Sequence, residues 1–190
     1  MDARALLDIL HVAERLKDAT RHCYTSGGRR ESVAEHSWRA ALTALLLKDE
    51  FPQADMDKVV RMCLIHDLGE AFTGDIPAFD KTQADEANED ALLNAWVASL
   101  SEPLSGEWRG LYAEMNARET LEAKIYKAID GLEAVIQHNE SDIATWLPLE
   151  YELNRTYAND KVAFSPYLQQ LRRAVLQDTL DKIAGEEPQP

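Results

Sequence analysis

The segment 63–77 constrains this chain more than any other, because ionisable side chains crowd the end of an apolar run. Its candidate metal-binding or proton-carrying residues are His66, Asp67, Glu70 and Asp75. Adjacent side chains on a helix point about 100° apart, so His66 and Asp67 can face one point only where a helix ends or bends. Gly69 offers a place for such an end or bend, and a tight turn at Gly74 is expected to bring Asp75 back toward the pair.

Taken alone, a His-Asp pair is weak support for a site, because most such pairs form ordinary hydrogen bonds at the surface. The pair indicates a metal site only if further ligand-type side chains lie elsewhere in the chain. His36 and Asp130 meet this condition. His36 follows the capping box of Ser32 and Glu35, in the first turns of a helix, and takes either a core-edge or a ligand position.

Asp130 stands beside the apolar stripe of a later helix. The stripe consists of Ile125, Ile129, Leu132 and Ile136. A partly buried carboxylate needs compensation, which either a lysine salt bridge or a metal ion supplies. The four candidate ligands are therefore His36, His66, Asp67 and Asp130. Two imidazoles and two carboxylates suit a divalent ion such as Mn, Co, Fe, Ni, Mg or Zn, with positions left open for water and substrate.

Apolar residues recur at helical spacing along most of the chain, which predicts an all-α fold. The expected helices cover residues 2–17, 32–51, 56–66, 108–115 and 165–184, with another within 80–100, one that begins near Thr120 and a loop-helix within 141–158. No segment has the pattern of a strand, and the arginine-rich residues 18–31 are expected to form a loop. We predict one compact helical domain over residues 1–184 and a flexible tail at 185–190.

The composition indicates which binding partners and which cellular compartment to expect. The formal net charge of −14 argues against nonspecific binding of nucleic acid, since phosphate backbones repel an acidic surface. Only two cysteines are present, so a disulfide framework is not indicated. The chain has no apolar run long enough to span a membrane and no signal-peptide core. We therefore expect a cytoplasmic protein without membrane or nucleic-acid partners.

Arg21 lies in the predicted loop together with Arg29 and Arg30. Such a run of arginines is usually solvated. A guanidinium group also matches the geometry of a phosphate group, which two parallel hydrogen bonds can hold. The residues alone leave both interpretations of Arg21 open.

The four candidate ligands, in their order along the chain, resemble the H…HD…D signature of the HD-domain metal-dependent phosphohydrolases. Three local strings, residues 31–38, 66–70 and 74–77, are similar to the branch that contains the 5′-deoxynucleotidases. The motif core covers about residues 20–140. The resemblance implies a compact HD-domain bundle, a homodimer, and hydrolysis of (deoxy)nucleoside monophosphates to nucleoside and phosphate.

The resemblance also implies roles for individual residues. The four candidate ligands match the metal-binding positions of the family. Glu70 and Asp75 match acidic residues that handle protons during the reaction, or that help to hold a second ion in some relatives. Arg21 matches an arginine that contacts phosphate, and we expect Trp38 and Lys127 to contact the substrate as well.

One departure and two alternatives concern the substrate. The 5′-deoxynucleotidase branch usually has a tryptophan just after the phosphate-binding arginine, where this chain has His22, Cys23 and Tyr24. An HD hydrolase of a triphosphate or an alarmone would need more basic groups than this short, acidic chain offers, which favours a monophosphate. A nucleotide- or metal-binding module without turnover would have no need of Glu70 and Asp75 beside the ligands.

Overall fold

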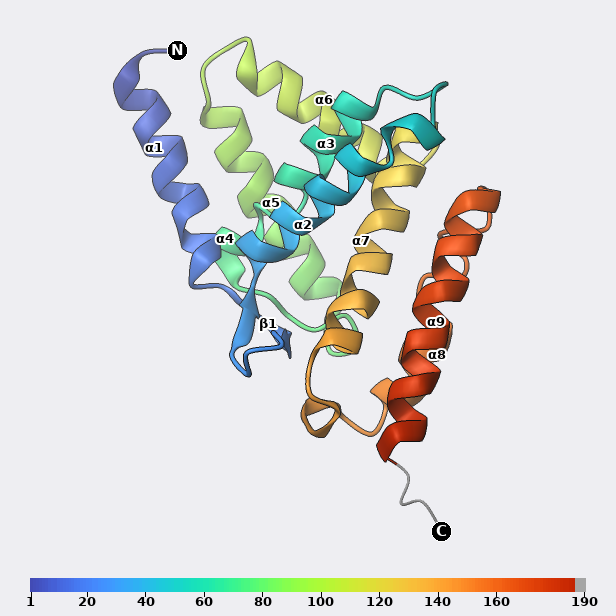
Figure 1. The fold of residues 1–190 in the computed structure, drawn as a ribbon. Coiled ribbons are helices and arrows are strands. Elements are labelled where there is room, and N and C mark those ends of the chain that lie inside the picture. The colour runs from blue at the N-terminus through green and yellow to red at the C-terminus, as the bar shows by residue number, and fades with distance from the viewer. Residues whose placement is uncertain (187–190) are drawn as a thin grey trace.

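The computed structural model describes residues 1–186 and is helical over most of that length, which confirms the predicted all-α class (Figure 1). The elements are α1 (Ala3–Glu14), η1 (Arg15–Lys17), β1 (Thr20–Tyr24), β2 (Arg30–Ser32), α2 (Val33–Leu46), η2 (Lys48–Glu50), α3 (Met56–Ile65), α4 (Glu70–Thr73), α5 (Gln83–Ser99), α6 (Leu104–Ala117), α7 (Leu121–Glu140), η3 (Ile143–Thr145), α8 (Glu150–Thr156) and α9 (Pro166–Glu186). The last helix includes the first two residues of the predicted tail. The remainder of that tail lies outside the described residues.

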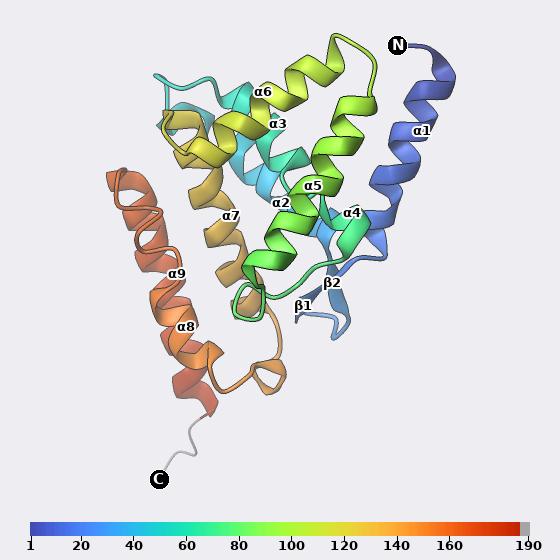
Figure 2. The same ribbon diagram turned by 180° about the vertical axis from the view of Figure 1, so that it is seen from behind.

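Three helices, α2, α3 and α7, form the centre of the fold (Figure 1). They bury apolar side chains against one another, among them Val33, Ala40, Val59, Met62, Cys63, Ile125, Ile129 and Leu132. Helices α5 and α6 lie on one side of α7 and α9 runs along its other side, as the view from behind shows (Figure 2). Burial of this apolar surface fixes the positions of the three central helices relative to one another. Residues far apart in sequence can therefore meet between them.

Side-chain caps start the three central helices where the sequence predicts them. Ser32 N donates to Glu35 Oε2 at 2.9 Å, and Glu35 N donates to Ser32 Oγ at 3.3 Å, which completes the capping box of α2. Asp55 and Thr120 cap α3 and α7 through bonds from backbone amides. One boundary differs, because α6 begins at Leu104 and not near residue 108.

The prediction that the chain has no strand was wrong, because β1 and β2 pair as an antiparallel hairpin. Its turn contains Gly28 at a φ of 80°, and Gly28 N donates to Thr25 O at 3.0 Å. Strands of five and three residues are too short for a two-residue repeat to be recognised. The hairpin matters for function, because β1 lies against α7 and places Arg21 and His22 at a pocket.

Helix α1 lies at the edge of the molecule and buries none of its residues (Figure 1). Its leucines Leu6, Leu7 and Leu10 are about half exposed. None of the described helices has the length and apolarity that crossing a membrane requires. Cys23 and Cys63 are both buried and unpaired, in line with the expected lack of disulfides.

Candidate metal centre and substrate pocket

The His-Asp pair lies where the sequence predicts the end of a helix. Helix α3 stops at Ile65, and the chain turns through His66 and Asp67 into the short helix α4. The turn brings Nε2 of His66 within 3.0 Å of Oδ2 of Asp67. The predicted glycine turn is also present, since Gly74 has a φ of 75° and Asp75 lines the same pocket as Asp67.

Helices α2 and α7 bring the other two candidate ligands to this pair. Nε2 of His36 lies 3.2 Å from Nε2 of His66 and 3.6 Å from Oδ2 of Asp67. Oδ1 of Asp130 lies 3.2 Å from Nε2 of His36 and 3.7 Å from Nε2 of His66. His36 and Asp130 are 94 positions apart in the sequence, yet they converge on one point.

Hydrogen bonds on the far side of each ring determine which nitrogen faces this cluster. Nδ1 of His66 lies 2.8 Å from the carbonyl oxygen of Cys63, an acceptor that only an N–H group satisfies. Nδ1 of His36 contacts the carboxylate of Glu133 in the same way. A neutral ring that is protonated at Nδ1 directs the lone pair of Nε2 into the cluster. Two such lone pairs and two carboxylates repel one another unless a cation lies among them.

The pKa values of the cluster also indicate that it requires positive charge. Burial alone would lower the pKa of His66, but Asp67 and Asp130 outweigh it and hold that pKa well above its usual range. Burial would raise the pKa of Asp130, but Lys127 and His36 outweigh it and hold the pKa well below its usual range. In the absence of a metal ion, protons therefore neutralise part of the cluster.

The donor set fits a divalent metal ion. Donor atoms that share one such ion at about 2.1 Å lie about 3.0 to 3.4 Å apart. Between the two histidine Nε2 atoms, and from these atoms to Asp67 Oδ2 and Asp130 Oδ1, the separations run from 3.0 to 3.7 Å. Mixed imidazole and carboxylate donors suit Mn, Co, Fe, Ni, Mg and Zn, so the set does not select one metal.

A pocket of about 300 Å³ opens beside the cluster. The predicted residues that line it are Arg21, Asp67, Glu70, Asp75, Lys127 and Asp130. Lys127 Nζ donates to Asp130 Oδ2 at 2.8 Å, so this lysine links a candidate ligand to the pocket. The guanidinium of Arg21 lies 3.1 Å from the buried carboxylate of Glu31, which holds it at the pocket wall.

The pKa of the Glu70 carboxyl group is strongly raised in this pocket. Its side chain is buried, and its Oε2 has no hydrogen-bond partner within the described residues. Burial, together with the negative charges of Asp67 and Asp75, raises its pKa to about 10. Burial also raises the pKa of Asp75, although Arg21 opposes the rise. Perturbed carboxyl groups in a pocket are typical of acid-base catalysis.

Trp38 does not reach this pocket, so the structure does not support its predicted contact with substrate. The side chain is 61% exposed and is not among the residues that line the pocket. Two residues correspond to about 200° of rotation on a helix, so Trp38 points away from the direction of His36. His36 is completely buried, and Trp38 consequently faces solvent.

The far end of the pocket contains polar residues that motif spacing did not reveal. Nε2 of His138 lies 2.7 Å from Oε1 of Glu150, and Nε2 of His22 lies 3.2 Å from the same oxygen. The ring of His22 also meets Phe79 edge-on, with centroids 5.6 Å apart. His22, where the chain departs from the 5′-deoxynucleotidase branch, thus lies in the pocket wall.

Glu70 and Asp75 do not build a second cluster of the same kind. Within the described part of the chain, neither belongs to a group of three ligand-type side chains whose donor atoms all lie within 4.8 Å of one another. A second ion beside Glu70 and Asp75 therefore stays a prediction. The group of His36, His66 and Asp67 does meet this criterion.

The comparison with protein families covers most of the chain, because the HD domain model matches residues 13–172. The chain belongs to the HD domain family. This HD domain is 32% identical to the human 5′-deoxynucleotidase HDDC2 over 142 residues, which are 73% of this chain and 69% of the human protein. It is 33% identical to the Bos taurus 5′-deoxynucleotidase HDDC2 over 142 residues, which are 73% of this chain and 68% of the bovine protein.

Solved structures share the architecture of this HD domain. A predicted metal-dependent phosphohydrolase from Magnetospirillum magnetotacticum is 27% identical, with a TM-score of 0.76 over 94% of this chain and 95% of that chain. A conserved hypothetical protein from Pyrococcus furiosus is 28% identical, with a TM-score of 0.69 over 90% of this chain and 98% of that chain. The likeness therefore includes both the helical core and the later helices.

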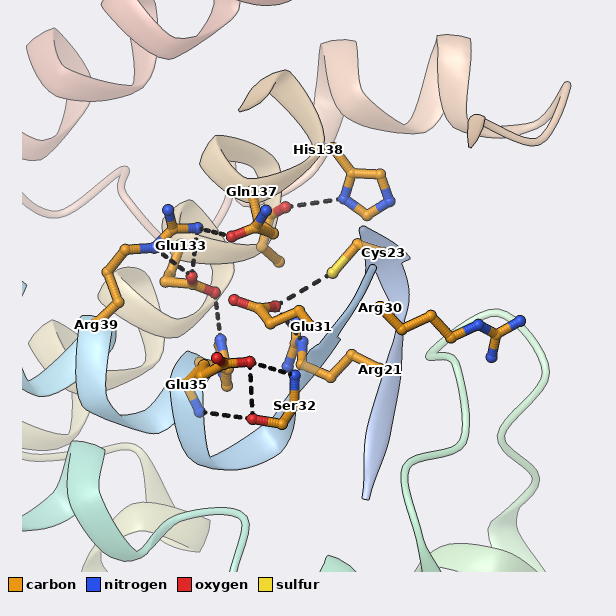
Figure 3. A network of polar contacts seen from close by, with 12 residues as sticks. Arg21, Cys23, Arg30, Glu31, Ser32, Glu35, Arg39, Glu133, Gln137 and His138 are labelled. Carbon is orange, nitrogen blue, oxygen red and sulfur yellow. Dashed lines mark hydrogen bonds and ion pairs between the residues drawn. The ribbon is translucent and has the colours of Figure 1, made fainter. Parts of the chain in front are cut away.

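Glu133, which contacts Nδ1 of His36, belongs to a network of polar contacts with Arg39 and Gln137 (Figure 3). Glu133 accepts a hydrogen bond from Arg39 Nε at 2.7 Å, and Arg39 also donates to Gln137 Oε1 at 2.6 Å. Cys23 Sγ donates to the neighbouring Glu31 at 3.2 Å. Sequence spacing contained a signal for Glu133, because it lies three residues after Asp130 and so on a neighbouring face of the same helix.

We expect Glu133→Gln to weaken metal binding by roughly 10- to 100-fold, because the charge that orients His36 and raises its basicity is lost. Competition titration against a metal-binding dye measures this affinity. Glu140→Gln is the matched control, since Glu140 contacts the same Arg39 but is half exposed. Equal metal affinities in both variants and in the wild type would contradict the supporting role of Glu133.

Proposed function

We propose that this HD domain protein is a metal-dependent phosphohydrolase that converts (deoxy)nucleoside 5′-monophosphates to nucleoside and phosphate. The observation that carries the proposal is the convergence of two imidazoles and two carboxylates at the wall of a pocket that also contains Arg21, Glu70 and Asp75. The curated relatives named 5′-deoxynucleotidase support the substrate class. A pocket of about 300 Å³ is at the small end of ligand sites, which favours a monophosphate over larger nucleotides.

The residues that would hold the metal ion are His36, His66, Asp67 and Asp130. Such an ion, when bound, supplies positive charge that activates a water molecule and neutralises phosphoryl charge. Arg21 adds a guanidinium group for the phosphoryl oxygens, whose charge grows during the transfer. Its ion pair with Glu31 keeps this long side chain oriented before substrate arrives.

Two carboxyl groups carry the protons of the proposed reaction. Oε2 of Glu70 has no partner among the described residues, so it is free to bond to the attacking water. Its pKa of about 10 applies without a metal ion, and the positive charge of a bound ion would lower that pKa and let Glu70 ionise and act as a base. Asp75 has a raised pKa as well, which favours a protonated form that can donate to the sugar oxygen as its bond to phosphorus breaks. The water oxygen forms the new bond to phosphorus, and the nucleoside leaves as the alcohol.

Phosphate release tests the proposed function. The purified protein is assayed with a panel of ribo- and deoxyribonucleoside monophosphates in the presence of Mn, Co or Mg in turn. We expect release that requires added metal. Metal-loaded protein that releases no phosphate from any monophosphate would overturn the assignment, and triphosphates and alarmones would then be the next substrates.

We expect Arg21→Lys to lower kcat/KM for nucleoside monophosphates by about 10- to 100-fold, because an ammonium group cannot replace the paired hydrogen bonds of a guanidinium. The lysine keeps a positive charge beside the buried Glu31, which protects the fold. Arg30→Lys in the same hairpin is the matched control, and we expect it to change kcat/KM by less than about twofold. A loss of equal size in both variants would contradict the specific role of Arg21.

We also propose that the protein is a homodimer that uses an exposed apolar stripe of α2. The α2 stripe consists of Trp38, Leu42, Leu45 and Leu46, which share one side of the helix and are 37% to 75% exposed. Contiguous apolar surface of this kind marks interaction sites. A two-fold axis would place each stripe against its own copy, which requires no other partner.

We expect the double change Leu45→Glu/Leu46→Glu to raise the dissociation constant of the dimer by at least about 100-fold, because four buried charges would repel at the interface. Light scattering coupled to gel filtration measures the mass as a function of concentration. Leu180→Glu, an exposed leucine on α9, is the control. A wild-type protein that is monomeric at all concentrations would refute the dimer.

The cytoplasmic location and the lack of a nucleic-acid partner stay predictions from composition.

A further inference from the structure

A second pocket, of about 320 Å³, lies next to the catalytic pocket and is rich in basic residues. It forms where the end of α6, the first half of α7 and the segment between α8 and α9 meet. Its lining includes Arg118, Lys124, Lys127, Asp160, Lys161 and Phe164, and we call it the basic pocket. Lys127 lines both this pocket and the catalytic one.

Three cations of the basic pocket lack the acidic partners that this chain has in excess. The protein contains 34 acidic and 20 basic residues. Even so, Arg118, Lys124 and Lys161 form no ion pair within 4.0 Å among the described residues, whereas Lys127 is paired with Asp130. The one carboxylate of the pocket lining, Asp160, makes no ion pair with them either. Neighbouring cations without counter-charge repel one another, and an anion between them would relieve that repulsion.

The position of Lys161 is determined by packing and not by a counter-ion. Its Nζ lies 4.1 Å from the centre of the Tyr157 ring, a cation–π contact. Its aliphatic stem lies close to α7 at Gly131, where a Cβ atom would come within 3.1 Å of Lys161 Cδ. The structure therefore holds this ammonium group at the pocket without neutralising it.

The backbone around the basic pocket is unusual as well. Among the described residues, Arg118 and Ala158 alone combine a positive φ with a side chain, at 54° and 65°. Arg118 belongs to the pocket lining, and Ala158 precedes Lys161 by three residues. At Arg118 this conformation ends α6, because Arg118 is its left-handed C-cap and Arg118 N donates to Glu114 O at 3.1 Å. Both exceptions of this chain thus occur in segments that build one pocket.

We propose that the basic pocket binds a phosphate group at a site separate from the catalytic one. Guanidinium and ammonium groups from separate segments can surround the oxygens of a phosphate, as the pairing geometry of Arg118 and the point charges of Lys124 and Lys161 allow. The partly exposed ring of Phe164 offers an apolar face for a base if a nucleotide carries the phosphate. The two sources of this chemistry are inorganic phosphate and a nucleoside monophosphate. Phosphate binding at the basic pocket does not require hydrolysis, so this proposal can be tested independently of the proposed hydrolase activity.

The test is an NMR titration of the full-length protein in a chelating buffer, so that no substrate is turned over. Inorganic phosphate and a nucleoside monophosphate are added separately, at constant ionic strength. We expect backbone amides of residues 118–124 and 158–164 to shift in a saturable manner. Shifts with both ligands identify the phosphate group as the recognised element, and shifts with the monophosphate alone identify a nucleotide site.

Charge-reversal variants make the test specific. We expect Lys124→Glu and Arg118→Glu each to weaken binding at these amides by at least about tenfold, because an attracting charge becomes repelling. Lys17→Glu is the matched control, since Lys17 is an exposed lysine of η1 outside both pockets. Unchanged affinity in the two pocket variants, or identical shifts with chloride, would overturn the proposal.

Discussion

Asp67→Asn is expected to remove both metal binding and hydrolysis, with a fall in phosphate release of at least about 1,000-fold. The carboxylate of Asp67 lies 3.0 Å from Nε2 of His66 and 3.6 Å from Nε2 of His36, at the centre of the donor cluster. A divalent ion contributes several kcal/mol to the stabilisation of charge in such reactions, and about 4 kcal/mol corresponds to a thousandfold in rate. An amide of the same shape keeps the packing and loses the charge.

The measurement combines elemental analysis of the purified variant with phosphate release at saturating metal. Asp57→Asn is the matched control, because Asp57 is an exposed aspartate in the first turn of α3, the helix that leads into Asp67. We expect the control to keep wild-type metal content and activity. An Asp67→Asn protein that retains its metal and its rate would show that Asp67 is not a ligand.

The central helices and the cluster between them could be predicted from the sequence for a shared reason. A helix that buries one face repeats its apolar residues every three or four positions, so Ile125, Ile129 and Leu132 reveal the inward side of α7. Asp130 is then conspicuous as a carboxylate beside that side. His66 is conspicuous in the same way at the end of α3, and the capping box locates the start of the helix that carries His36.

The features that could not be predicted depend on contacts between distant segments. The hairpin strands are too short for a periodic pattern, and their pairing with each other and with α7 is tertiary. The approach of Glu150 to His22 and His138 brings together three separate elements. Trp38 lies only two positions after His36, but helical rotation directs it to the opposite side of α2. Proximity in sequence and proximity in space differ most on helices.

Glu70→Gln is expected to lower kcat by about 100- to 10,000-fold while metal content stays at the wild-type level, because a general base is removed and no proposed ligand is touched. Retention of metal distinguishes this variant from Asp67→Asn. Glu86→Gln is the matched control, since Glu86 also lines the pocket but has no role in the proposed reaction. A Glu70→Gln enzyme with a wild-type rate would contradict the assignment of Glu70 as the base.

Glu70→Gln should also stabilise the protein when metal is absent, because ionising the buried Glu70 costs free energy in the folded state. The pKa of Glu70 is about 10 in the folded protein against 4.5 for an ordinary glutamate. Between these values the folded state keeps a proton that the unfolded state has released, so stability falls as the pH rises through this window. Glutamine resembles the protonated acid at every pH and escapes this loss.

We therefore expect metal-free Glu70→Gln to exceed the metal-free wild type in free energy of unfolding by on the order of 1–3 kcal/mol near neutral pH. The advantage should shrink as the pH falls toward 4.5 and vanish below it, where residue 70 is neutral in both the folded and the unfolded state. Urea unfolding in a chelating buffer at several pH values measures it. A variant that is no more stable than the wild type at neutral pH would show that Glu70 ionises without cost in its buried position, and the argument for its basicity would fail.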